Sequence, residues 1–280
     1  MRPRTTNRYN EAMHWKPSAS VPPSHIVDSP KLVVNEIVAR RRAAMAGSVS
    51  PIDELPHIPV GYAAGRHTSE FLTSNFRKRY RPTAMDVKPS EVTAVLRDAG
   101  VKDWVLMGLH GYVGYLQQAR ATEDVDVLVG DSEVKIAIAA ISKRWPDLIV
   151  KATDVVVRFL DPGEVSADER PKPVIDVMLP WSDLHVEILR SQVRHDETTD
   201  DRFPSLEAAL AAKYAAMILP NRTFIKKQQD AVDFRSILVL HHDQVDRDEL
   251  TRLAELIWRG ATPDILKMLD AARNDKPFQL

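Results

Sequence analysis

The chain has 280 residues, 44% of them hydrophobic, and its 38 basic and 39 acidic side chains give a formal net charge of −1. This length allows one sizeable core or two small ones, and the balanced charge argues against a protein that coats nucleic acid. Cysteine is absent, which excludes disulfides, thiolate nucleophiles and cysteine-ligated zinc. No stretch approaches the roughly 20 apolar residues that cross a bilayer, so we expect a cytoplasmic protein with no membrane partner.

Residues 1–85 are rich in proline and polar residues and lack sustained apolar periodicity. Such a composition is typical of a poorly ordered extension, which we expect to be removable without unfolding the rest. Two basic clusters lie within it, at residues 32–45 and 77–81. Each is either a solvated face or a contact to RNA or DNA phosphates.

Residues 86–198 alternate between helix and strand patterns with short connections, which predicts an α/β or α+β core with a mixed sheet flanked by helices. A helix is expected from Ser90 to Ala99, ended by Gly100, and another over residues 131–145. Four strands are expected, and the last two should pair as neighbours; they cover residues 104–107, 124–129, 155–160 and 174–179.

Residues 199–280 follow a helical pattern, beginning with a helix that Ser205 caps. Apolar periodicity returns in residues 231–240, 250–258 and 265–269. This part is predicted to be a helical C-terminal subdomain.

Two aspartates stand at alternate positions of a predicted strand, Asp124 and Asp126. Side chains two apart in a strand point to one face, so these carboxylates should project together while the intervening valines enter the core. A cation between them would relieve their repulsion, and such oxygen ligands suit Mg²⁺ or Mn²⁺. The bland alternative is an acidic surface face, since isolated pairs of this kind are common.

Further residues point to the same site. Asp176 interrupts an apolar strand, where an unpaired carboxylate is costly without a partner or a metal. Gly108 and Gly111 lie at a strand-to-helix turn, where free backbone N–H groups can hold phosphate oxygens. Arg120 and Thr122 add a cation and a hydroxyl just before the paired aspartates.

The ordered run of these motifs resembles the minimal nucleotidyltransferases of the polymerase-β superfamily, and in particular bacterial abortive-infection (AbiE-type) toxin-like members. The similar segments are GLHGYVGYLQQARATEDVDVLV, PKPVIDVMLP and the helical stretch from residue 204 to 238. The resemblance extends over residues 101–271 and leaves the first 85 residues outside it.

The resemblance implies transfer of a nucleoside monophosphate from an NTP with two divalent ions, Mg²⁺ or Mn²⁺. Asp124 and Asp126 would bind both ions, and Asp176 would bind one and help deprotonate the acceptor hydroxyl. Arg120 would neutralise charge on the departing phosphates; alternatively it pairs with Glu123 or Asp124.

One position departs from the family pattern, because the family's turn has serine after glycine. Here Leu109 and His110 follow Gly108. Backbone groups or His110 would have to hold the phosphates instead. His110 is equally interpretable as a packed histidine of the turn.

Lys213 lies within an alanine-rich helix, where a lone ammonium must reach solvent or meet an anion, for which the NTP triphosphate is the candidate. Lys226 and Asp230 have the i,i+4 spacing of an intrahelical ion pair.

The acceptor stays open between an RNA end, a protein side chain and a small molecule. The toxin-like relatives suggest a toxin with an antitoxin protein as partner. The rival hypotheses are a catalytically silent nucleotide- or partner-binding module and a metal-dependent phosphodiesterase.

Overall fold

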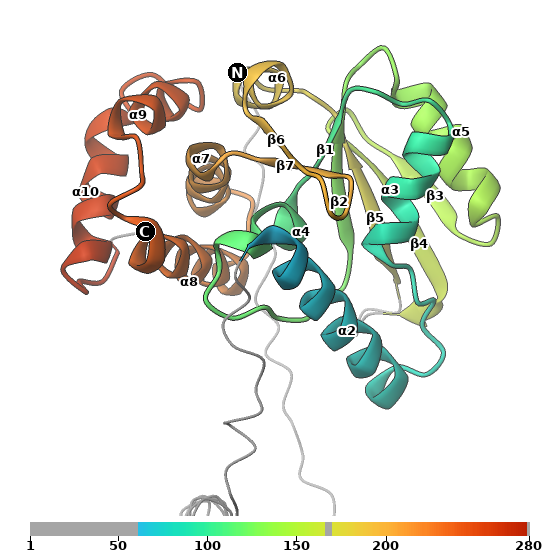
Figure 1. The fold of residues 1–280 in the computed structure, drawn as a ribbon. Helices are drawn as coiled ribbons and strands as arrows, with labels where there is room; N and C mark the ends of the chain where they lie inside the picture. The colour runs from blue at the N-terminus through green and yellow to red at the C-terminus, as the bar shows by residue number, and fades with distance from the viewer. Residues whose placement is uncertain (1–60, 166–169, 279–280) are drawn as a thin grey trace, which may run out of the picture. The chain divides into compact units, whose positions relative to one another are not determined.

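The computed structural model describes residues 61–165 and 170–278, so the basic cluster at residues 32–45 lies outside the described part. Helices and strands alternate along much of the chain (Figure 1). In chain order they are α2 (Tyr62–Tyr80), α3 (Pro89–Asp98), β1 (Trp104–Leu106), α4 (Gly108–Tyr112), the 3₁₀ turn η1 (Val113–Tyr115), β2 (Val125–Val129), α5 (Val134–Arg144), β3 (Ile149–Ala152), β4 (Val156–Val165), β5 (Pro171–Met178), α6 (Asp183–Ser191), β6 (Val193–Asp196), β7 (Asp201–Pro204), α7 (Leu206–Ile218), α8 (Phe224–His241), α9 (Arg247–Glu255) and α10 (Thr262–Arg273).

The sheet has five strands in the order β1-β2-β5-β4-β3. Strands β2 and β5 are parallel, and every other neighbouring pair is antiparallel. The predicted pairing of the two later strands is confirmed, since β4 and β5 are neighbours. Strand β3 was not predicted, because all four of its residues are exposed and leave no buried face to detect.

Alternation along β2 divides the sheet into two faces. Val125, Val127 and Val129 are buried in a cluster that includes side chains of α3 and α5, and both helices lie together beside the sheet (Figure 1). The intervening Leu128 belongs to a second cluster that contains side chains of α6 and α7. The sheet is therefore flanked by helices on both faces, as the sequence predicts.

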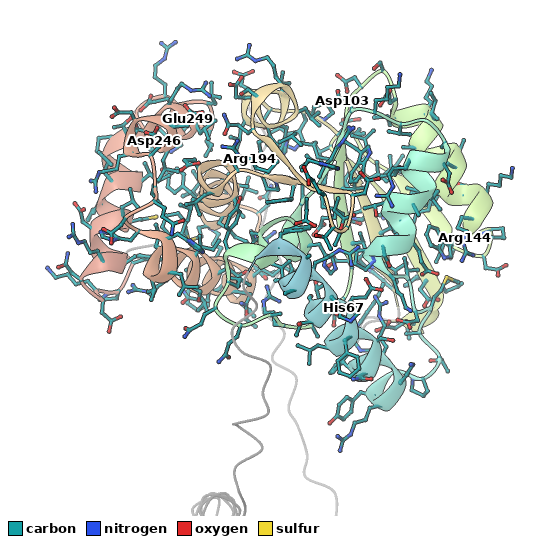
Figure 2. All side chains as sticks on the ribbon, viewed as in Figure 1. His67, Asp103, Arg144, Arg194, Asp246 and Glu249 are labelled. Carbon is teal, nitrogen blue, oxygen red and sulfur yellow. The ribbon has the colours of Figure 1, made fainter. Side chains whose placement is uncertain are left out.

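The predicted helical character of the C-terminal part, the helical subdomain, is confirmed in α7 to α10 (Figure 1). The predicted cap at Ser205 is present, because its hydroxyl accepts a hydrogen bond from the Ala208 backbone N–H. Asp246 (labelled in Figure 2) caps α9 in the same way by accepting from the backbone N–H groups of Asp248 and Glu249. The short β6–β7 hairpin precedes this subdomain and was not predicted, and residue 199 lies in its turn.

Helix α2 corrects the expectation of a loop-like chain before residue 86, because residues 62–80 form a 19-residue helix. Apart from Tyr62 and Gly65, its buried positions are polar: Arg66, Ser69, Thr73 and Arg77. The Arg77 guanidinium donates to the carbonyl oxygens of Val87 and Glu123, at 2.9 and 2.6 Å. Apolar periodicity could not reveal a helix that packs through polar side chains.

Among the described residues, no helix is long and apolar enough to span a membrane.

Candidate metal centre

Three aspartates meet where β2 and β5 run side by side. Asp126 of β2 lies directly across from Asp176 of β5 in the parallel register, and Asp124 stands just before β2. Each contributes a carboxylate oxygen, and these three oxygens all lie within 4.8 Å of one another. The expected convergence of the carboxylates is therefore confirmed.

All three carboxyl groups have raised pKa values, and the Asp124 charge contributes to the rise at both of the others. Burial, then the charges of Asp124 and Asp176, hold the pKa of Asp126 well above its usual range. Burial, then the Asp124 charge, raises the pKa of Asp176 to about 6. Burial also raises the pKa of Asp124, against the opposing charge of Lys226. Such a cluster is destabilising when fully ionised, and a cation between the carboxylates would remove the repulsion.

The donor set fits a hard divalent cation. All three candidate ligands are carboxylates, the ligand type that such ions prefer. The Oδ1 atom of Asp176 is buried and has no hydrogen-bond partner among the described residues. A bound cation would provide the partner that this oxygen lacks. The three aspartates could hold a divalent metal ion.

Gly108 allows the turn after β1 to lie directly against Asp126. Its φ of +55° is in the left-handed region, which favours glycine. A Cβ atom at this position would lie 1.9 Å from Asp126 Oδ2, so no other residue fits beside the carboxylate. Gly108 is thus a member of the site by geometry.

Gly111 was predicted to bind phosphate through its backbone N–H, and this prediction is wrong. That N–H donates to the Met107 carbonyl within the turn at 3.0 Å. A Cβ atom here would lie 2.5 Å from the Leu106 carbonyl oxygen and 3.1 Å from Pro204 Cδ. Close packing of α4 on β1 and β7 explains this glycine.

His110 is corrected to a packed histidine. The residue is only 2% exposed, so its ring cannot reach a bound nucleotide. Burial, then the charges of Arg66, Arg77 and Arg120, lowers its pKa to about 3 and keeps the imidazole neutral. The structure therefore supports the packed role of His110.

Arg120 and Thr122 take different places relative to the aspartates. Thr122 Oγ1 donates to Asp124 Oδ1 at 3.3 Å, so its hydroxyl lies at the site. The Arg120 guanidinium instead donates to Asp233 Oδ2 at 3.0 Å and to the Tyr112 hydroxyl at 3.1 Å. The pairing with Glu123 or Asp124 is therefore wrong, because α8 presents a buried carboxylate that the sequence could not place.

Lys213 meets protein anions. Its ammonium lies 2.9 Å from both Asp230 and Asp233 and 4.3 Å from the centre of the Tyr112 ring. Its charge also lowers the pKa of Asp126, which places it near the carboxylates. The predicted pair of Lys226 with Asp230 is replaced by ion pairs of Asp230 to Lys213 and Arg222.

Three cations near the aspartates were not identified as site residues. Arg158 Nε lies 3.4 Å from Asp176 Oδ2, Arg222 lowers the pKa of Asp126, and Lys226 lowers those of Asp124 and Asp176. Arg158 lies directly opposite Asp176 in β4. Only the strand register could have revealed it.

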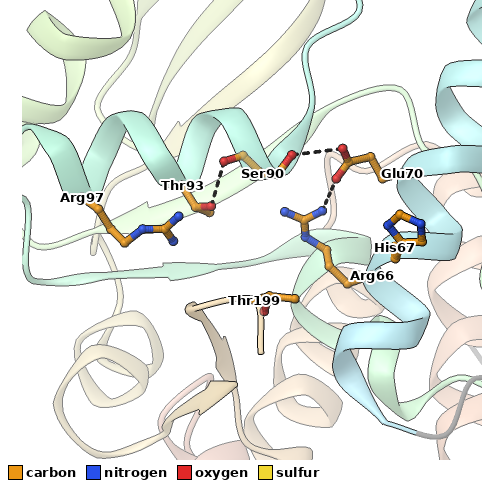
Figure 3. A pocket seen from close by; sticks show the side chains of 7 residues that line it. All are labelled: Arg66, His67, Glu70, Ser90, Thr93, Arg97 and Thr199. Carbon is orange, nitrogen blue, oxygen red and sulfur yellow. Dashed lines mark hydrogen bonds and ion pairs between the residues drawn. The ribbon is translucent and has the colours of Figure 1, made fainter. Parts of the chain in front are cut away.

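A pocket of about 230 Å³ lies apart from the aspartates, between α2, α3 and the β6–β7 turn (Figure 3). Its lining charges are largely paired: Arg66 contacts Glu70 and Asp201, and Arg97 contacts Asp200. It shares no lining residue with the aspartate cluster, and we assign it no part in the site; the lining comprises Arg66, His67, Glu70, Ser90, Thr93, Arg97 and Thr199.

The chain was compared with protein families, curated proteins and solved structures. No family model matches the chain, and no curated protein matches it. Among solved structures, the chain is similar to an antigenic nucleotidyltransferase-like protein from Paracoccidioides brasiliensis, at a TM-score of 0.40 and 17% identity, over 68% of this chain and 92% of that chain.

Proposed function

We propose that this protein is a metal-dependent nucleotidyltransferase, which moves a nucleoside monophosphate from an NTP to an acceptor hydroxyl. One observation carries the proposal: Asp124, Asp126 and Asp176 converge on two neighbouring parallel strands, within ligand distance of one another. Three carboxylates in one site match the demands of divalent-metal-assisted phosphoryl chemistry.

Asp124, Asp126 and Asp176 would hold the ions, for which Mg²⁺ is our first choice and Mn²⁺ the second. When bound, the ions supply positive charge that neutralises the triphosphate and polarises the reacting phosphorus. Asp176, whose pKa is raised to about 6, is suited to accept the proton of the acceptor hydroxyl near neutral pH. The acceptor oxygen forms a bond to the α-phosphorus as the bond to the pyrophosphate oxygen breaks.

Other residues would bind the NTP phosphates or orient the metal-binding carboxylates. The turn at Gly108 approaches Asp126 closely enough for backbone groups to face the NTP phosphates. Thr122 would orient Asp124 through its hydrogen bond. Lys213 would supply positive charge beside Asp126, and Arg120 would act through Asp233, which it shares with Lys213.

A second function is favoured by one specific observation. The turn carries Leu109 in place of the family's serine, and neither His110 nor the Gly111 N–H is available to a phosphate. A catalytically silent module that binds nucleotide or a partner protein is therefore the alternative. A phosphodiesterase that uses the same aspartates is third.

We further propose a cellular role and an acceptor class. Toxin activity, an antitoxin partner and a cytoplasmic location follow from the resemblance and the cysteine-free sequence. The acceptor is an RNA end, a protein or a small molecule.

Pyrophosphate release tests the function. The protein would be incubated with each NTP and Mg²⁺ or Mn²⁺, with and without total RNA and total protein. Metal-dependent pyrophosphate release with labelling of one acceptor pool supports nucleotidyl transfer. Release of a monophosphate from a diester substrate would indicate a phosphodiesterase, and NTP binding without turnover would indicate the silent module.

A further inference from the structure

Four charged residues form one row across the sheet. Asp126 of β2 lies opposite Asp176 of β5, Asp176 lies opposite Arg158 of β4, and Arg158 lies opposite Lys151 of β3. Directly opposed residues on neighbouring strands project from the same face of a sheet. The face that carries the aspartates therefore continues outward with two cations.

This outer part of the face is open to solvent. Lys151 is exposed, the Arg158 side chain is 48% exposed, and Ile149, two residues from Lys151 in β3, is 46% exposed. On the opposite face of β4, Val157 and Phe159 are buried at 3% and 0% exposure. A ligand can thus reach Lys151 and Arg158 from solvent, on the face of the sheet that carries Asp176.

The contact between Arg158 and Asp176 is weak enough to exchange. Its distance of 3.4 Å and the exposure of the arginine are those of a surface ion pair, which contributes little stability. Any cation held by Asp176 would repel the guanidinium and favour its turning towards an anion. A guanidinium has a planar set of donors that matches phosphate oxygens.

Lys151 can add to the same anion site. It forms no ion pair with any residue in 61–165 or 170–278. Neighbouring strands lie roughly 4.8 Å apart, so Arg158 and Lys151 can both contact one phosphate group or two successive ones. A neutral acceptor, such as an unmodified hydroxyl side chain, gains nothing from two such cations.

We propose that Arg158 and Lys151 form a phosphate-binding strip that seats a phosphate-bearing acceptor, with the acceptor hydroxyl at Asp176. The inference rests on the proposed function, because it assigns the acceptor class of that same site. The phosphate belongs either to a polynucleotide end or to a small phosphorylated molecule, and both present the same chemistry to the strip.

Two variants that each remove one positive charge test the strip, Arg158→Gln and Lys151→Gln. The matched control is Lys143→Gln, at an exposed position of α5. Binding of a fluorescein-labelled short oligoribonucleotide is measured by anisotropy without NTP, and ribose 5-phosphate or inorganic phosphate is added as competitor. Mn²⁺ affinity is measured separately by calorimetry.

Each strip variant should weaken oligoribonucleotide binding about tenfold and reduce its salt dependence by about one phosphate contact, as expected for a lost charged contact. Arg158→Gln should also tighten Mn²⁺ binding, because it removes a competing positive charge, whereas Lys151→Gln should leave Mn²⁺ binding unchanged. Replacement of an arginine with a purely structural role would not strengthen Mn²⁺ binding.

Competition distinguishes the two phosphate sources. If the oligoribonucleotide binds and the small phosphates compete only weakly, the acceptor is a polynucleotide; if the small phosphates displace it readily, the acceptor is a small phosphorylated molecule. The strip is overturned if the wild type binds neither probe, if both variants match Lys143→Gln, or if transfer to a protein acceptor survives both substitutions. Failure of the proposed function is a separate result, since it appears as the absence of metal-dependent pyrophosphate release by the wild type, whether or not the oligoribonucleotide binds.

Discussion

At the level of single residues, the three aspartates have different surroundings. Asp126 stands between two other carboxylates, and its pKa responds to both. Asp176 is the member that has both a buried oxygen without a partner and an arginine at its edge. These differences support different roles in binding the NTP and receiving the acceptor.

Asp176→Asn should lower nucleotidyl transfer by orders of magnitude while Mg²⁺–NTP binding changes little. The substitution keeps the shape of the side chain but removes the charge on the acceptor side, so the loss falls on the transition state. Single-turnover transfer and equilibrium NTP binding would be compared with Asp147→Asn, which neutralises an exposed acid. Unchanged transfer in Asp176→Asn would disprove its role.

The raised pKa of Asp176 predicts a pH-dependent stability of the metal-free protein. Its folded-state pKa of about 6 lies above the unfolded value, so the folded protein binds this proton more tightly than the unfolded chain does. The stability that the bound proton contributes is therefore fully present below about pH 4 and is lost as the pH rises through 6. A rise of that size corresponds to on the order of 3 kcal/mol. In EDTA, the melting temperature of Asp176→Asn minus that of the wild type should therefore increase between pH 4 and pH 7.5. A constant difference would contradict the raised pKa, and saturating Mg²⁺ at pH 7.5 should reduce it.

Gly108→Ala should abolish metal binding, because its Cβ would occupy the space of Asp126 Oδ2. Gly100→Ala is the matched control: Gly100 also has a positive φ, of +76°, but a Cβ there has nothing within 4 Å. Both variants should lose about 1 kcal/mol or more of unfolding free energy from backbone strain. Only Gly108→Ala should lose Mn²⁺ affinity in calorimetry, and equal Mn²⁺ affinities in the two variants would contradict the close approach.

At the level of elements, α2 supports the segment that leads into the aspartates. Thr73 Oγ1 accepts from the Thr122 backbone N–H at 3.1 Å, and Arg77 donates to the Glu123 carbonyl. Residues 122 and 123 directly precede Asp124. The helix therefore fixes the start of β2 through hydrogen bonds to its backbone.

Arg77→Ala should destabilise the protein by about 2–4 kcal/mol, because it leaves the buried Val87 carbonyl and the partly buried Glu123 carbonyl without this donor. Lys78→Ala, an exposed neighbour on the same helix, should change the stability by less than about 0.5 kcal/mol. Urea denaturation gives both values. Equal stabilities of the two variants would contradict the stabilising role of Arg77.

At the level of the whole described molecule, an ionic network around the buried Asp233 joins the helical subdomain to α4 and to the segment before β2. Asp233 of α8 accepts hydrogen bonds from Lys213 of α7, from the Tyr112 hydroxyl of α4 and from Arg120. Burial by itself would raise the pKa of Asp233, but Lys213, Tyr112 and Arg120 lower it. The ionised Asp233 carboxylate thus holds the helical subdomain beside the site.

Asp233→Asn should cost about 3–5 kcal/mol of unfolding free energy, because Lys213 and Arg120 lose their shared buried counter-charge. Asp243→Asn, whose carboxylate is 92% exposed, should have no measurable effect. Because the folded-state pKa of Asp233 is lowered, the wild-type advantage should be present at neutral pH and decline as pH falls below about 4. Chemical denaturation at pH 7 and pH 3.5 measures this, and an equal advantage at both values would contradict it.

The sequence by itself determined the elements that bury apolar side chains. The valines of β2, the strand around Asp176 and the Ser205-capped helix follow periodicities that hydrophobic burial imposes locally, and the three aspartates could be read from their places in those strands. Tertiary structure alone decided which charges meet. Asp233 became the partner of Arg120, His110 became a core residue, Arg158 came opposite Asp176, and α2 packed through polar groups. Each of these depends on contacts between segments far apart in the chain, and hydrogen bonds and ion pairs leave no period in the sequence by which to predict them.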